Sequence, residues 1–304
     1  MERWWIRPVV RLVLAVALPF LVPLLIAGMI WAMPGDPASN VCPDCSGEGM
    51  LQMIQDRNLD QGPLHFYTEW MSSMVSGDFG RSWSFQSGEE VSYLLKSGVG
   101  FTLKLFLLGA LLILAGAFLT ARGWIPRWLK SGIRLVGLLP GLVLSLAAIA
   151  VYTVYINPSA METTWTQVAM GALILAIADA ALSGTIDGVD EVIETEGRRR
   201  YVQIAILRGE GTLMNILPNT LPGLVGQVRA RMLSLLSAAI IIEMILKING
   251  VGELLVVGAL KQDFPLVMAC TFFYVVISSM MLLLQAVLEI GVALFIRKSP
   301  KGVG

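Results

Sequence analysis

The chain is organised around a charge-rich segment that lies between hydrophobic runs, residues 187–222, with the sequence DGVDEVIETEGRRRYVQIAILRGEGTLMNILPNTLP. Residues 201–207 at its centre carry apolar side chains at helical spacing. Gly209 and Gly211 predict an end to that helix, before Thr212 caps the next one. The segment therefore predicts a short helix–turn–helix. A solvated linker between two membrane spans is the alternative, which this segment alone leaves open.

Composition decides the class of protein. Hydrophobic residues make up 56% of the 304 residues and charged residues only 14%, whereas a soluble domain has about 25% charged residues. The mean hydropathy is +0.72. The sequence thus predicts an integral membrane protein in contact with lipid. The net charge of zero gives no electrostatic reason to expect a nucleic-acid partner, and three cysteines with one histidine offer little for a metal site.

Six apolar runs predict six membrane-spanning helices, in residues 12–33, 100–121, 135–155, 168–182, 232–246 and 266–296. The first run exceeds the apolar core of about 7–15 residues in a cleaved signal peptide, so we expect a retained first helix. Lys and Arg favour a topology with both termini in the cytoplasm. The predicted fold is a single all-α domain, residues 1–304. It has an external cap at 34–100 and a cytoplasmic loop at 186–222.

The predicted cap contains the segments PGDPA (34–38), LDQGPLHFYTEW (59–70) and GDFGRS (77–82), and FTLKL (101–105) follows it. Tyr67 and Trp70 lie three residues apart on one helical face, where they serve either solute contact or anchoring at the lipid headgroups. Cys42 and Cys45 form a C-P-D-C whose spacing also suits a redox pair or half a zinc site. Without a second such pair, we expect a disulfide in an oxidising compartment, with two free thiols as the alternative.

Charged residues inside apolar runs are costly and are therefore candidates for function. Asp179, Arg229, Arg231, Glu243 and Glu289 are of this kind. Arg229 and Arg231 point about 200° apart on a helix, so only one of them can face a solute pathway. Contact with cytoplasmic headgroups is the alternative for both arginines, and helix contacts are the alternative for Glu243.

Residues 240–269, IIIEMILKINGVGELLVVGALKQDFPLVMA, predict a tight external turn before the last helix. Gly250 and Gly252 suit a re-entrant turn. Pro265 suits the first turn of the last helix, with Asp263 as its N-cap.

Taken in order, these segments resemble the permease subunits of ABC importers of the dipeptide/oligopeptide/nickel family. Ala205, Arg208 and Gly209 match the A-x-x-K/R-G of the family's coupling loop, and the cap segments and residues 240–269 match further family motifs in the same order. Departures are Gln203 and Ile204, where the family has Glu-Ala, and Asn249, where it has proline.

The resemblance implies roles for particular residues. Those expected to contact an ATP-binding subunit are Tyr201, Ala205, Arg208, Gly209, Glu210 and Gly211. Those expected at the external gate or at a binding-protein contact are Asp78, Gly250, Gly252, Asp263 and Pro265. Arg229, Arg231 and Glu243 are candidates for the solute pathway.

The resemblance also implies an assembly in a bacterial inner membrane: this chain, a second homologous permease, two ATP-binding subunits and a periplasmic solute-binding protein. The partners would bind ATP and Mg, because this chain contains no P-loop sequence and no catalytic constellation. A secondary transporter is the alternative. It predicts internal repeats, which the sequence lacks. A membrane-bound enzyme or scaffold would need reactive groups that the sequence also lacks. The family's solutes include peptides, nickel complexes, oligosaccharides and opines, and the sequence does not choose among them.

Overall fold

A computed structural model describes residues 6–32, 47, 51, 54–55, 58–156, 165–209 and 212–298 of the chain. The predicted Cys42–Cys45 pair, Glu210 and Gly211 lie outside the described residues. Within them, regular structure is helical apart from one isolated antiparallel bridge between Arg81 and Glu90. The all-α prediction is therefore confirmed for the described part of the chain.

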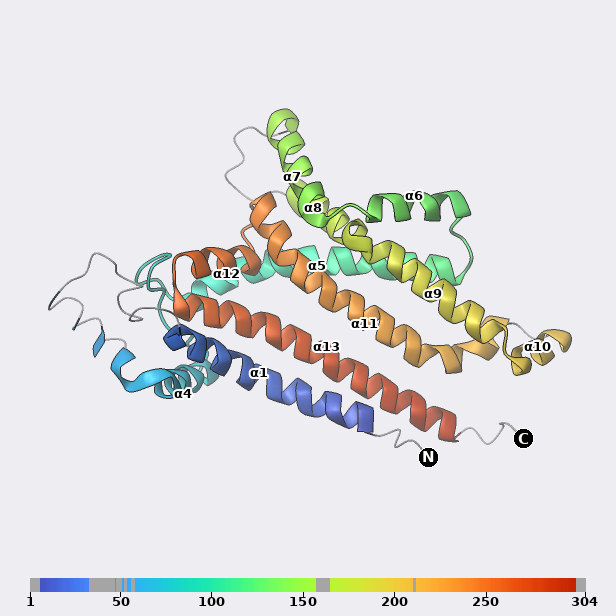
Figure 1. The fold of residues 1–304 in the computed structure, drawn as a ribbon, viewed down its shortest axis with the longest axis horizontal. Helices are drawn as coiled ribbons and strands as arrows, with labels where there is room; N and C mark the ends of the chain where they lie inside the picture. The colour runs from blue at the N-terminus through green and yellow to red at the C-terminus, as the bar shows by residue number, and fades with distance from the viewer. Residues whose placement is uncertain are drawn as a thin grey trace.

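Helices and short helical turns make up nearly all of the regular structure in the described chain. In chain order they are α1 (Ile6–Ala32), η1 (Leu59–Gln61), α4 (Gly62–Val75), α5 (Val91–Ala121), α6 (Arg127–Gly137), α7 (Gly141–Val151), η2 (Tyr152–Ile156), α8 (Trp165–Ile177), η3 (Ala178–Ala180), α9 (Ala181–Gly197), α10 (Arg200–Leu207), α11 (Thr212–Leu246), α12 (Val251–Leu260) and α13 (Phe264–Lys298). The axes of the long helices α1, α5, α9, α11 and α13 are roughly aligned, and α7 projects sideways from them (Figure 1).

Four helical segments of the described chain are long and apolar enough to cross a membrane: Val9–Ala32, Val91–Ala121, Trp165–Gly197 and Phe264–Leu288. The bent pair Arg127–Gly137 and Gly141–Tyr155 makes a fifth if it counts as one span. The predicted run 232–246 forms the end of α11, a helix of 35 residues. The structure thus supports four or five spans, and the count of six stays a prediction.

Two of the predicted spans are broken. α6 and α7 meet at an angle of 90°, because Pro140 lacks a backbone donor and starts a new helix instead of continuing the old one. In the fourth span the backbone of Asp179 (φ 51) and Ala180 (φ 56) is left-handed, which separates α8 from α9. Apolar runs alone do not reveal either break.

The predicted cytoplasmic loop, by contrast, is more helical than its prolines suggest. Pro218 and Pro222 lie inside α11, as Pro19 and Pro23 lie inside α1. Proline inside a membrane helix is tolerated where neighbouring helices and side chains satisfy the freed carbonyls. The predicted loop end at residue 222 therefore lies within a continuous helix.

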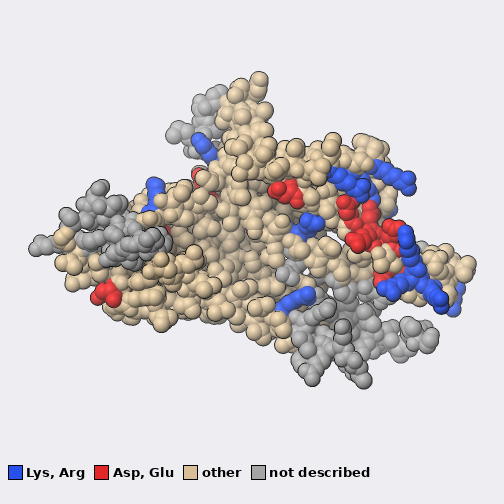
Figure 2. Space-filling view, viewed as in Figure 1, with Lys and Arg blue, Asp and Glu red and all other residues tan. Residues whose placement is uncertain are grey.

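The core lies between α5, α8, α11 and α13, where apolar side chains interdigitate. Fully buried examples are Leu105, Ile113, Leu235, Ile242 and Leu266. Large apolar side chains also cover the outside of the bundle, which suits lipid contact. On the face shown in Figure 2, most charged side chains gather at one end, and only a few interrupt the apolar middle.

α10, the N-terminal end of α1 and the C-terminal end of α13 lie at one end of the bundle, whereas α4 and α12 lie at the other end (Figure 1). The structure thus places the predicted coupling segment and the predicted cap at opposite ends. In the cap, Trp70 is buried and the Tyr67 hydroxyl donates to the Phe20 carbonyl at 3.0 Å. Both aromatic residues therefore help to hold α4 against the bundle.

Candidate functional site

The short helix α10 has one face on the protein and one face free. Val202 and Ala205 are buried against the bundle, and α10 packs on α11 and α9. Tyr201, Ile204 and Leu207 are exposed, and Leu207 leaves 87% of its surface uncovered. Exposed apolar side chains at the charged end of a membrane protein suit a protein partner better than water.

The end of α10 is formed as the sequence predicts. Gly209 has φ +76, a left-handed conformation that glycine adopts without steric cost. Its N–H donates to the Ile206 carbonyl at 2.9 Å, and the Arg208 N–H donates to the Ile204 and Ala205 carbonyls, each at 3.1 Å. The predicted helix break at Gly209 is confirmed. Its predicted contact with an ATP-binding subunit stays a prediction.

Side chains tie α10 to the end of α9. The Tyr201 hydroxyl donates to a Glu196 carboxylate oxygen at 3.0 Å, and the Gln203 amide donates to the Gly197 carbonyl at 2.9 Å. Arg199 lies 3.6 Å from the same Glu196 carboxylate. A force on α10 would therefore act on α9 directly.

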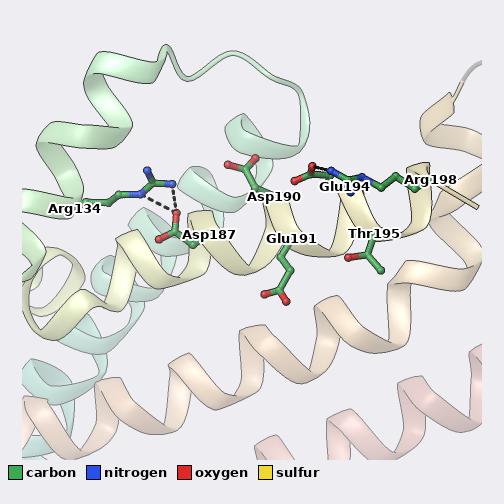
Figure 3. Close-up of a pocket in the computed structure, with 7 residues that line it drawn as sticks. All are labelled: Arg134, Asp187, Asp190, Glu191, Glu194, Thr195 and Arg198. Carbon is green, nitrogen blue, oxygen red and sulfur yellow. Dashed lines mark hydrogen bonds and ion pairs between the residues drawn. The ribbon is translucent and has the colours of Figure 1, made fainter.

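α9 is in turn attached to α6 by two ion pairs. The Lys130 ammonium lies 2.6 Å from an Asp190 oxygen, and the Arg134 guanidinium donates to Asp187 at 2.5 and 3.0 Å. Figure 3 shows Arg134 pointing at Asp187. An ion pair between Glu194 and Arg198 follows along α9.

An open cleft of about 500 Å³ adjoins these pairs, lined by Arg134, Asp187, Asp190, Glu191, Glu194, Thr195 and Arg198. Most of its charges are already paired with each other, so the cleft offers structural contacts rather than a reactive group. None of these residues is among the site residues predicted from the sequence. A usable signal was present, because the acidic residues recur every three or four positions and Lys130 and Arg134 are four apart.

At the opposite end, the start of α12 is held against α11 and α5. The Glu243 carboxylate is fully buried and accepts the Gly252 N–H at 2.7 Å, while the Val251 N–H donates to the Thr102 hydroxyl at 2.8 Å. A Cβ on Gly250 would lie 2.7 Å from the Thr102 hydroxyl oxygen, and one on Gly252 would lie 2.7 Å from the Ile240 Cα. Close approach of the backbone therefore requires both glycines.

Asp263 joins the cap to the last helix. Its fully buried carboxylate accepts the Ser82 hydroxyl at 2.5 Å and the N–H groups of Ser84 and Phe85 at 3.0 and 2.9 Å. It also accepts the Leu266 N–H at 3.4 Å, which confirms its predicted capping of α13. Pro265 follows in the first turn of that helix. Asp78 has a smaller, exposed role, because it accepts the Gly80 N–H at 2.8 Å.

The charged candidates for a solute pathway are not gathered into one site. The Arg231 guanidinium packs against α9 at Gly184, where an added Cβ would lie 2.9 Å from the Arg231 Cζ. Glu243 lies on the same helix about 18 Å away, at 1.5 Å per residue. Its buried carboxylate faces the backbone of α12, which fits a role in helix contacts. The side chains of Arg229 and Glu289 lie outside the described part.

Comparison with known proteins supplies the remaining observation. No protein-family model matches the chain. A stretch of 265 residues is 24% identical to the glutathione transport system permease protein GsiC of Escherichia coli (strain K12), covering 82% of this chain and 85% of the relative. The protein of the same name from Shigella boydii serotype 4 (strain Sb227) shows the same identity and coverage. The resemblance to ABC importer permeases is confirmed. With its apolar spans, the chain is a multi-pass transmembrane protein of the permease type.

Proposed function

We propose that this permease chain is one transmembrane subunit of an ATP-driven importer in a bacterial inner membrane. A second homologous permease supplies the other half of the solute pathway. The observation that carries the proposal is α10, a short helix at the charged end of the bundle that exposes Ile204 and Leu207 while it is tied to α9.

Two ATP-binding subunits dock on the α10 segments of the two permeases, and they bind ATP and Mg. When ATP draws these subunits together, each α10 moves, and the side-chain ties at Glu196 and Gly197 transmit the movement to α9. The permease is then a two-state element whose inward-open and outward-open forms bind the ATP-loaded partners with different affinity.

A periplasmic binding protein delivers the solute to the other end, at the cap and α12. Asp263 connects the loop at Ser84 and Phe85 with the start of α13, so a partner bound at the cap acts on a membrane helix. We propose a peptide or a related small solute. Glutathione, the solute in the relatives' name, is the first probe to use.

Co-purification tests the proposal. We expect the tagged chain, extracted from its native membrane in a mild detergent, to carry an ATP-binding subunit that Leu207→Asp releases. Val75→Asp, at the end of α4 on the other end of the bundle, serves as the control, because Val75 is 80% exposed. Glutathione uptake into liposomes by the purified chain alone, without ATP, would instead support a secondary transporter.

A further inference from the structure

α6 and the start of α7 run antiparallel to α9 and to η3 before it, with contacts from Lys130 to Gly141. At the charged end, Lys130 contacts Asp190 and Arg134 contacts Asp187. Each step along α6 from there is matched by a similar step back along α9. Contacts between α6 and α9 therefore recur at successive turns of the two helices instead of at one position.

The same register continues through the two helix breaks. A Cβ on Gly137 would lie 2.9 Å from the Ser183 hydroxyl oxygen, so the two helices approach closely there. The Asp179 N–H donates to the Leu139 carbonyl at 3.3 Å, and the Asp179 carboxylate accepts the Gly141 N–H at 3.2 Å. The break between α6 and α7 is thus hydrogen-bonded to the break between α8 and α9.

Little else supports α6. It packs on α9 and, less extensively, on η3 and α8. Its other side is uncovered, with Trp128 75% and Leu135 70% exposed. At the charged end of α6, therefore, the two ion pairs provide its main described attachment to the bundle.

We propose that Lys130 and Arg134 are positioning residues that make α6 move with α9 when the ATP-binding partners act on α10. This inference rests on the proposed function, and it adds residues and a path that the coupling segment itself does not contain. The movement passes from α10 through Glu196 to α9, and from Asp187 and Asp190 to α6.

The coupled movement of α6 and α9 acts on α7. This helix leaves the bundle at 90° to α6 and packs mainly on α11. Because the Asp179 carboxylate holds the first residue of α7, a shift of α9 acts on α7 at its start while α6 steadies it from the other side of the break. A rigid α6–α9 pair then converts movement at the charged end into movement of α7.

Spin-label distances in the assembled complex test this inference without knowledge of the solute. One label goes on α6 at Gly132→Cys, where a Cβ meets no atom within 4 Å. Another goes on α9 at Glu191→Cys, which points away from Arg134 (Figure 3). Each is measured against a reference label at the exposed Val13→Cys on α1, in a background without native cysteines. Distances are compared without nucleotide and after trapping with ATP and vanadate.

In the otherwise unmodified complex we expect both labels to shift together. In the variant with both Lys130→Asp and Arg134→Asp the α9 label should still shift and the α6 label should not, because both ion pairs are broken. Adding Asp187→Arg and Asp190→Lys to that variant restores both ion pairs in the opposite sense and should recover the α6 shift. Arg127→Asp reverses a charge on α6 at a position with no ion pair in the described chain, and it should leave both shifts intact.

The outcomes separate the two proposals. An α6 shift that persists in the variant with both Lys130→Asp and Arg134→Asp overturns the inference, and so does failure of the charge-restored variant to recover it. Labels on α6 and α9 that shift independently in the unmodified complex overturn it as well. If no ATP-binding subunit assembles with the chain, the proposed function itself is wrong.

Discussion

The Glu243 carboxylate accepts the Gly252 N–H at 2.7 Å, so a buried acidic side chain of α11 holds the first turn of α12. This contact depends on a glycine, because a Cβ on Gly252 would lie 2.8 Å from the same carboxylate oxygen and 2.9 Å from the Tyr274 hydroxyl oxygen.

We therefore predict that Gly252→Ala destabilises the chain by about 1–3 kcal/mol, the usual cost of overpacking a core. Gly100→Ala in α5 is the matched control, since a Cβ there meets nothing within 4 Å. Thermal unfolding of both variants in detergent measures the difference. Equal melting temperatures would contradict the packing argument.

Gly209→Ala should weaken binding of the ATP-binding subunit while membrane insertion stays intact. The reason is conformational, because a Cβ at Gly209 meets no atom but φ is +76. A left-handed non-glycine residue costs about 1–2 kcal/mol. Gly197→Ala, with ordinary φ and equal space, is the control, and Gly209→Asn should fall between the two. Quantitative co-purification gives the readout. Full binding by Gly209→Ala would remove the turn from its proposed role.

Asp263→Ala should release the loop at Ser82, Ser84 and Phe85 from the start of α13. The change removes an acceptor used by Ser82, Ser84 and Phe85, and losing hydrogen bonds to a charged group costs about 1.5–3 kcal/mol each. We expect faster hydrogen exchange at the Ser84 and Phe85 amides. Asp78→Asn, at an exposed turn, should leave that exchange unchanged. Slow exchange in Asp263→Ala would show that other contacts hold the loop.

A membrane-impermeant maleimide should label Cys42 and Cys45 only after reduction, if they form the predicted disulfide outside the membrane. Cys270 does not interfere, because it is buried. The variant with both Cys42→Ser and Cys45→Ser is the control. Labelling without a reductant would mean free thiols, and labelling only in inverted vesicles would reverse the predicted topology.

Gly184→Ala should displace Arg231, whose guanidinium occupies the space of the missing side chain. Arg231→Lys should lower thermal stability as well, since an ammonium does not reproduce the flat guanidinium. Gly132→Ala, in open space, is the control. Normal melting temperatures for both Gly184→Ala and Arg231→Lys would favour simple headgroup contact for Arg231.

Local signals predicted several features correctly. The helix end at Gly209 and the N-cap of α13 at Asp263 both depend on residues that are close together in sequence. Glycine and aspartate are the residue types that favour these two positions. The break at Asp179 and Ala180 was missed, because alanine there fits a helical pattern and because the Asp179 N–H bonds to the Leu139 carbonyl, a partner distant in sequence. The Lys130–Asp190 pair was also missed, since it joins residues 60 positions apart and depends on how helices pack.

The tie between Ser82 and Asp263 spans 181 residues, and α1 packs chiefly against α13. During synthesis the cap emerges early, yet the carboxylate that fixes it belongs to the start of the last helix. Likewise, α1 can pack against α13, its main neighbour, only after the ribosome has nearly finished the chain. The end of the bundle that holds α4 and α12 is therefore completed only when the whole chain has been made, so a chain truncated before Asp263 lacks the buried carboxylate that binds Ser82.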